Sequence, residues 1–218
     1  MEFYFDLKQG DTEWLEFRHA KIGGSRSKQL LIKSDTLLFE MIAETIEEFN
    51  EDENEDSYIN PAMERGNDLE PQARIELGKY LNLEFLECGW IQSEIPILGV
   101  SPDGITKNLK TSCEIKCPGA KKHTEWCIND VVPPEHLDQC IHYFTVNPLL
   151  EKHYFMSYRP EFNLKPIFVK ELTLNSEVNI GTKAKPIIKT IAEVVELKKE
   201  RAIELEKQIE QSINKLKF

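Results

Sequence analysis

The sequence has no apolar run that approaches the roughly 18 residues a membrane-spanning helix needs. Its first residues, MEFYFDLKQGD, also lack the basic and apolar regions of a secretory signal. These two absences argue against a membrane protein and against a secreted one. We therefore expect a cytoplasmic protein with no membrane partner.

Cysteine is scarce and irregularly spaced. The chain has five cysteines, an odd number that is typical of reduced thiols rather than of a disulfide framework. No C-x-x-C pair occurs and no cysteine follows position 140, so we expect no iron–sulfur cluster. A G-x-x-x-x-G-K-[ST] loop is also missing, which argues against a nucleotide cofactor or an ATP-driven motor.

Basic residues are in deficit. The chain has 27 Lys and Arg against 38 Asp and Glu, which gives a net charge of −11. Eight of the acids lie within residues 44–56, so the rest of the chain carries only −3. We expect this acidic segment to be a solvated, mobile loop. Two stretches, 18–33 and 105–124, are basic, and each can line a groove for nucleic acid or be ordinary solvated surface.

The pattern of apolar residues predicts helices first and strands later. Helical spacing is expected over residues 11–18, 25–31, 35–46, 61–81, 133–144 and, in a long tail beginning near 175, most strongly 186–216. Strands are expected over 85–91, 97–100, 112–117, 152–158 and 165–172. This order predicts a mixed α/β, or α+β, fold with a central β-sheet flanked by helices and a long C-terminal helix.

The length of 218 residues suits one domain, 1–218, with three parts. These are an N-terminal helical part (1–60), a core that carries the chemistry (61–172) and a C-terminal helical segment (173–218). Within them, we expect Trp14 in the hydrophobic core and His123 in a solvated loop.

The most specific pattern pairs a turn with a strand. Asp103 lies in a Ser-Pro-Asp-Gly turn, eleven residues before Glu114-Ile115-Lys116. Glu114 and Lys116 share one face of the predicted strand, and a hairpin-like return of the chain would bring Asp103 close to Glu114. Adjacent carboxylates repel unless a cation or proton lies between them, and hard divalent ions select such oxygen clusters. A lysine beside the metal would orient the attacking water or help to deprotonate it, so the set suits phosphodiester hydrolysis.

Each part alone is ordinary, because Ser-Pro-Asp-Gly is a common β-turn and Glu-x-Lys is usually a solvated strand face. Together they resemble the PD-(D/E)XK nuclease signature, with its restriction-endonuclease-like core. The surrounding sequence resembles the YqaJ-like viral recombinase family, to which bacteriophage lambda exonuclease belongs. The matching segments are 9–18 (QGDTEWLEFR), 22–25 (IGGS), 66–71 (GNDLEP), 101–104 (SPDG), 114–118 (EIKCP) and 139–143 (QCIHY).

The resemblance implies a role for each matching residue. The implied metal ligands are Asp103, Glu114, Glu70 and the carbonyl oxygen of Ile115. The implied catalytic residues are Glu70, Asp103, Glu114, Lys116, which positions water, and Gln139, near the scissile phosphate. The implied binding site for DNA and its 5′ phosphate comprises Arg18, Ser25, Ser101 and Tyr143. An arginine with hydroxyl groups is a sensible phosphate pocket, because guanidinium binds phosphate oxygens bidentately.

The resemblance implies a Mg²⁺-dependent deoxyribonuclease, with Mn²⁺ able to substitute. The expected activity is 5′→3′ exonuclease action on double-stranded DNA ends, leaving a 3′ overhang for a single-strand annealing protein in phage-type recombination. It also implies a bacterial or phage-encoded protein and is compatible with a homotrimeric ring that threads DNA.

Other interpretations of the same residues stay open. The same active site would serve an endonuclease or a single-strand nuclease. A recombination accessory module that binds DNA ends without cutting, or a small acidic interaction protein whose helical tail recruits partners, would not need the two acids and the lysine. Arg18 can instead pair with Glu13 or Glu16, and Gln139 can be an exposed helix residue.

Overall fold

The computed structural model describes residues 1–32, 35–51, 61–182 and 184–217, apart from the side chains of 61–63. Its main sheet has the strand order β4 (Gly104–Ile105), β5 (Thr111–Lys116), β6 (Lys152–Tyr158), β7 (Ile167–Leu172). The β5–β6 pair is parallel and the two outer pairs are antiparallel, so the predicted mixed sheet is confirmed. A smaller antiparallel sheet joins β1 (Glu2–Tyr4), β2 (Trp90–Gln92) and β3 (Gly99–Val100).

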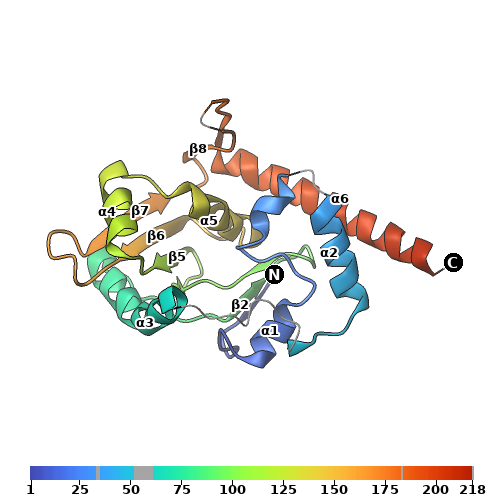
Figure 1. The fold of residues 1–218 in the computed structure, drawn as a ribbon, viewed down its shortest axis with the longest axis horizontal. Helices are drawn as coiled ribbons and strands as arrows, with labels where there is room; N and C mark the ends of the chain where they lie inside the picture. The colour runs from blue at the N-terminus through green and yellow to red at the C-terminus, as the bar shows by residue number, and fades with distance from the viewer. Residues whose placement is uncertain (33–34, 52–60, 183, 218) are drawn as a thin grey trace.

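Helices cover both faces of the main sheet (Figure 1). On one face, α3 (Pro61–Leu81) packs Ala73 and Leu77 against Cys113 and Ile115 of β5, all within a small apolar cluster. On the other face lie α4 (Ala120–Asn129) and α5 (Pro134–Val146), whose apolar side chains join the larger core. Proline at the first position of α5 fits its start, because that position needs no N–H donor.

Two N-terminal segments, the short 3₁₀ helix η1 (Ser27–Leu30) and α2 (Asp35–Ile46), pack against the long C-terminal helix α6 (Ile191–Leu216) beside the sheet. Helix α1 (Thr12–Arg18) instead contacts β2, through Phe17 and Trp90. In Figure 1, α6 runs along α2 and past α5, and its buried residues belong to the same core as those of α2. None of these helices, nor any other in the described ranges, is long and apolar enough to cross a membrane.

Several stretches depart from the predicted elements. The strand expected over 85–91 is present only as β2 at 90–92, and Leu86 forms just an isolated bridge with Ile105. The loop expected around His123 is helix α4, where His123 is fully buried and bonds to Ser157 Oγ (2.7 Å) and to the carbonyl oxygen of Lys165 (2.8 Å). Its start carries no side-chain cap, so the sequence offers no signal for it.

The predicted start of the C-terminal helix near residue 175 is also wrong. A hairpin of β8 (Glu177–Asn179) and β9 (Ile188–Thr190) comes first and projects from the body in Figure 1. The helix begins only at Ile191, where Thr190 and Glu193 form a reciprocal capping box.

The acidic segment 44–56 is not one solvated loop. Glu44 lies within α2, where it accepts a hydrogen bond from Arg26 at 2.8 Å, and Glu40 pairs with the same guanidinium at 3.3 Å. Glu51 accepts a hydrogen bond from the Thr12 hydroxyl. Glu47 and Glu48 follow the helix and are exposed, and the four acids at 52–56 lie outside the described residues. Arg26, a member of the first basic stretch, is therefore paired with acids of the same chain.

Candidate active site

The predicted return of the chain between Asp103 and Glu114 is present. Strands β4 and β5 pair antiparallel with Gly104 opposite Cys113, which places Asp103 beside the end of β5. The Asp103 carboxylate accepts a hydrogen bond from the backbone N–H of Ile115 at 2.5 Å. A side chain at position 104 would meet Cys113 Sγ at 2.9 Å and Phe85 Cβ at 3.0 Å, so this close approach requires glycine.

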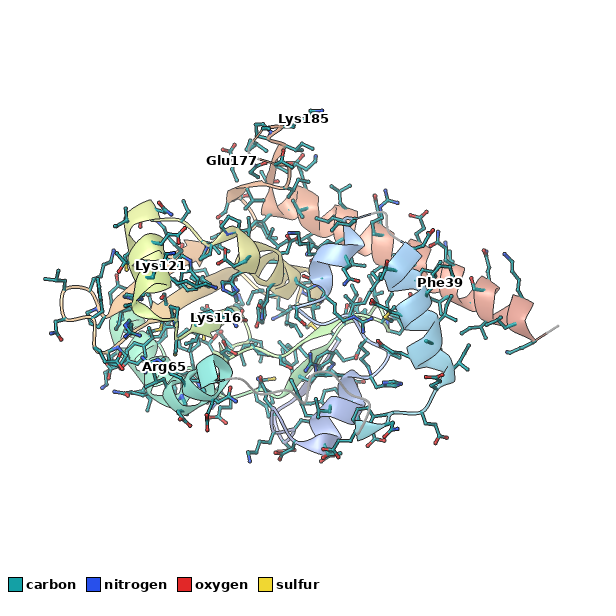
Figure 2. The ribbon with its side chains drawn as sticks, viewed as in Figure 1. Phe39, Arg65, Lys116, Lys121, Glu177 and Lys185 are labelled. Atoms are coloured by element: carbon teal, nitrogen blue, oxygen red, sulfur yellow. The ribbon has the colours of Figure 1, made fainter. Side chains whose placement is uncertain are left out.

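Glu114 is the most enclosed acid of the site, with a side chain that is 1% exposed. One carboxylate oxygen accepts a hydrogen bond from the Tyr143 hydroxyl at 2.5 Å, and the other forms an ion pair with Lys116 Nζ. Glu114 and Lys116 thus share a face of β5, as the strand period predicts. In Figure 2, Lys116 lies between Lys121 of α4 and Arg65 of α3.

Glu70 approaches the same place from α3. It is half-buried, and its carboxylate pairs with Arg74, one helical turn on, at 3.2 Å. Arg74 is itself 9% exposed and also pairs with Glu87 at 2.8 Å. Glu70 is therefore held by a cation whose own position is fixed from two sides.

The charges of these groups act on one another. Burial raises the pKa of the Asp103 carboxyl well above its usual range, and the charges of Glu114 and Glu70 raise it further. Burial also raises the pKa of Glu70, although Arg74 opposes the shift. Burial alone would lower the pKa of Lys116, but Glu114 and Asp103 outweigh it and raise that pKa overall. Three carboxyl groups thus share the site with the half-buried Lys116.

The donor set fits a hard divalent cation. Asp103, Glu114, Glu70 and the carbonyl of Ile115 offer only oxygen, which Mg²⁺ and Mn²⁺ prefer. A divalent cation would also relieve the repulsion that raises the pKa of Asp103. Within the described residues, no three His, Cys, Asp or Glu side chains are already gathered as a metal-binding group.

All but one of the predicted site residues line a single cleft of about 960 Å³. Those in the cleft wall are Glu70, Asp103, Glu114, Ile115, Lys116, Gln139, Arg18, Ser25 and Ser101. They come from α1, the segment before η1, α3, β5, α5 and the turn before β4. The volume is that of a ligand-binding site, and the open side can admit an extended substrate.

Tyr143 lies elsewhere than the sequence analysis expects. Its side chain is 1% exposed, behind Glu114, and its hydroxyl also donates to the carbonyl oxygen of Ser101 at 3.0 Å. The predicted contact between Tyr143 and DNA is therefore corrected, because a buried ring with an engaged hydroxyl does not reach a phosphate. Tyr143 holds Glu114 and the 101–103 turn instead.

Trp14 is not a core residue as predicted, because its half-buried ring forms part of the cleft wall. The guanidinium carbon of Arg18 lies 4.0 Å from the centre of this ring. The indole N–H contacts both the carbonyl oxygen of Gly89 (2.9 Å) and the Ser101 hydroxyl (3.0 Å). One tryptophan therefore orients two of the predicted phosphate-binding residues.

Gln139 packs against Gly24 in the cleft wall. A Cβ added at Gly24 would lie 2.8 Å from Gln139 Cγ, so only glycine allows this approach. Gln139 is half-buried in the wall, rather than simply an exposed helix residue.

Other residues of the cleft were missed as site residues. Gln9 donates hydrogen bonds to the carbonyl oxygens of Cys88 and Pro102, which fixes the turn that carries Asp103. Lys121 and Lys122, at the start of α4, belong to the basic stretch 105–124 and supply its positive charge to the cleft. If the sequence analysis had predicted a helix over 120–129, it would have placed both lysines at the start of that helix, beside the end of β5.

His136 also lines the cleft, packed between Trp126 and Phe155 at ring-centre distances of 5.4 and 5.6 Å. Burial and then the charge of Lys116 lower the pKa of His136 to about 4. The imidazole is therefore neutral near pH 7 and adds no positive charge to the cleft.

Comparison with known proteins gives a consistent picture. The family model of the YqaJ-like viral recombinase domain matches residues 13–148. The crystal structure of an alkaline exonuclease (LHK-Exo) from Laribacter hongkongensis has a TM-score of 0.71 and 24% identity, covering 95% of this chain and 96% of that one. The same exonuclease in complex with dAMP gives a TM-score of 0.69 at 24% identity, with 94% and 98% covered.

A phage-related exonuclease from Haemophilus somnus 129PT has a TM-score of 0.56 and 15% identity over 91% of this chain and 97% of its own. A comparison with curated proteins found no match. The structural likenesses confirm the predicted α/β fold class, which is that of these exonucleases.

Proposed function

The chain belongs to the family of the YqaJ-like viral recombinase domain, as its motifs predict, and on this premise we propose that it is a metal-dependent deoxyribonuclease. The observation that carries the proposal is the cluster of Asp103, Glu114 and Lys116 at the junction of β4 and β5, with Glu70 facing it in one cleft. A protein that only binds DNA has no need for buried, mutually repelling carboxylates beside a lysine.

We propose that Asp103, Glu114, Glu70 and the carbonyl of Ile115 hold Mg²⁺, with Mn²⁺ as a substitute. The ion would supply charge stabilisation at phosphorus and a more acidic bound water. Lys116 lies beside these ligands, in an ion pair with Glu114. We propose that it orients or helps to deprotonate the attacking water and stabilises the developing negative charge. Gln139 contacts the phosphate being cut.

The residues on the other side of the cleft determine which end of the DNA is bound. Arg18, stacked on Trp14, presents its guanidinium beside Ser101, and Ser25 lies on the same wall. These groups form a site for a terminal 5′ phosphate, which makes exonuclease action from a double-stranded DNA end the favoured mode. Cutting would then proceed 5′→3′ and release mononucleotides. A relative that binds dAMP is in keeping with a nucleotide product.

The negative net charge of the chain is consistent with DNA binding if the DNA contacts only the cleft, where basic residues gather. The net charge is −11, yet Arg18, Lys116, Lys121 and Lys122 all line one cavity. We propose that acids face away from the DNA and that several copies of the chain, in a homotrimeric ring, surround it. The 3′ overhang left behind would be passed to a single-strand annealing protein.

The test is a time course on linear duplex DNA with and without a 5′ phosphate, in Mg²⁺ and in EDTA, beside a closed circular plasmid. We expect Mg²⁺-dependent loss of the 5′-phosphorylated strand while the circle stays intact. Cutting of the circle would replace the exonuclease with an endonuclease. Binding of ends without cleavage would leave an accessory module that does not cut.

A further inference from the structure

The C-terminal helix places a fully buried lysine behind the cleft wall. Lys198 of α6 is 0% exposed, and it lies outside residues 13–148 that the family model matches. Its ammonium contacts the Ser27 hydroxyl at 3.3 Å, the carbonyl oxygen of Asp138 at 3.1 Å and the Asp138 carboxylate at 3.4 Å. One cation thus joins α6 to η1 and α5.

These contacts continue to the cleft. The Ser27 hydroxyl donates to the carbonyl oxygen of Asp138 at 3.1 Å, and the Ser27 N–H donates to the carbonyl oxygen of Gly24 at 3.3 Å. Gly24 packs directly on Gln139, the residue after Asp138. The path therefore closes on itself, from Lys198 through Ser27 and Gly24 to Gln139 and back through Asp138.

Burying the charged ammonium group of Lys198 costs free energy, because the group loses its hydration. Burial lowers the pKa of Lys198 to about 8, although Asp138 opposes the shift. When both members of a buried ion pair are replaced by well-packed apolar residues, the change is often neutral or stabilising. The gain from the charge therefore lies in fixing the relative position of three segments rather than in the stability of the core.

We propose that Lys198 is a positioning residue that sets the distance between the Gly24–Ser25 segment and Gln139, and so the preference of the cleft for a 5′-phosphorylated end. The effect on substrate rests on the proposed function, because it needs Ser25 and Gln139 to contact DNA. The effect on the cleft wall does not depend on it.

The experiment compares the full-length protein with Lys198→Met, Ser27→Ala and the double variant. Lys199→Met is the matched control, because Lys199 is the next residue of α6, half-buried, and pairs only locally with Glu196. Two quantities are measured for each variant: the ratio of kcat/KM on 5′-phosphorylated over 5′-hydroxyl duplex ends, and amide hydrogen exchange over residues 22–30 and 136–142.

We expect Lys198→Met to lower the phosphate preference about tenfold, as is usual for a residue that supports a ligand-contacting group. Exchange should rise in the two segments, and the variant should also be less stable overall, because the Asp138 carboxylate loses its buried cation. Ser27→Ala should act in the same direction, and the double variant should be no worse than Lys198→Met, since both break one network. Lys199→Met should match the unaltered protein.

Unchanged exchange in both segments of a folded Lys198→Met protein would overturn the inference, and so would a preference equal to that of the Lys199→Met control. If the unaltered protein cleaves no DNA, the proposed function fails. In that case the amide hydrogen exchange of Lys198→Met tests the positioning role by itself. Faster exchange confined to the two segments would support the role, and unchanged exchange would contradict it.

Discussion

The two faces of strand β5 differ in what they contact. Cys113 and Ile115 pack on Ala73 and Leu77 of α3 in a purely apolar layer. Ser112 and Glu114 point the other way, toward buried polar groups: Ser112 bonds to His153, and Glu114 bonds to Tyr143. The apolar face anchors the strand in the fold, and the polar face carries the acid and the lysine of the proposed active site. Because neighbouring residues alternate between them, the carboxylate is positioned by a layer that it does not touch.

The sharpest way to separate the two faces is to neutralise Glu114. In Glu114→Gln we expect activity to fall by roughly 10³-fold or more, because a proposed metal ligand and the partner of Lys116 are both lost. The fold should persist, since glutamine keeps the shape and the contact with Tyr143. Cleavage of linear duplex and the thermal midpoint measure the two effects. Glu151→Gln, an exposed partner of Lys110, is the control. Activity within tenfold of the control would exclude Glu114 from the mechanism.

The opposite change leaves the chemistry and weakens the apolar layer. Leu77 is fully buried, so Leu77→Ala should lower the free energy of unfolding by about 2–5 kcal/mol through lost burial and a cavity. Urea unfolding measures this loss. At a temperature where the variant remains folded, its kcat should stay within a few-fold of the parent value. A loss of kcat as large as that of Glu114→Gln would mean that the two faces are not separable.

Acid should destabilise the protein in part through the polar face of β5. Burial lowers the pKa of His153 to about 3, whereas an unfolded histidine titrates near 6.5. The unfolded chain therefore binds the extra proton first, and stability is lost as the pH falls below about 6.5. At pH 5 this one histidine should account for about 2 kcal/mol. Urea unfolding at pH 7.5 and pH 5 should show a smaller pH-dependent loss in His153→Gln than in the parent. An equal loss in the two proteins would assign the acid sensitivity elsewhere.

The smallest expected effect tests the link between α5 and the strand. Tyr143→Phe removes the hydroxyl that holds Glu114 and the carbonyl of Ser101, yet keeps the buried ring. We expect kcat to fall about tenfold while DNA affinity in EDTA is unchanged, because an outer partner of a metal ligand is lost. A lost affinity with unchanged kcat would instead return Tyr143 to the DNA-binding role first expected of it.

The turn and strand of the site could be predicted because their chemistry is local. Asp103, Glu114 and Lys116 lie within 14 residues of sequence, and a turn followed by strand alternation brings them together without help from the rest of the fold. The main strands and the long helices could be predicted for the same reason, since the period of apolar residues reflects the faces that become buried.

The remaining parts depend on contacts between distant residues. Trp14 reaches Ser101 across 87 positions, and Lys198 reaches Ser27 across 171. No local pattern separates a tryptophan that stacks on an arginine from one in the core. Helix α4 lacks a capping side chain, and the short β8–β9 hairpin carries too few residues to show alternation against a helical background.

The pairing of Arg26 with Glu40 and Glu44 has a consequence for the ionic-strength response of the protein. A basic side chain that is already paired with a carboxylate of its own chain neutralises little phosphate charge. It therefore displaces few of the cations that are condensed on the DNA. The slope of log affinity against log salt counts only the cations that neutralise phosphate, at about 0.9 per contact on duplex DNA. In the proposed function, the affinity of this chain for DNA should therefore fall less steeply with salt than its number of lysines and arginines suggests.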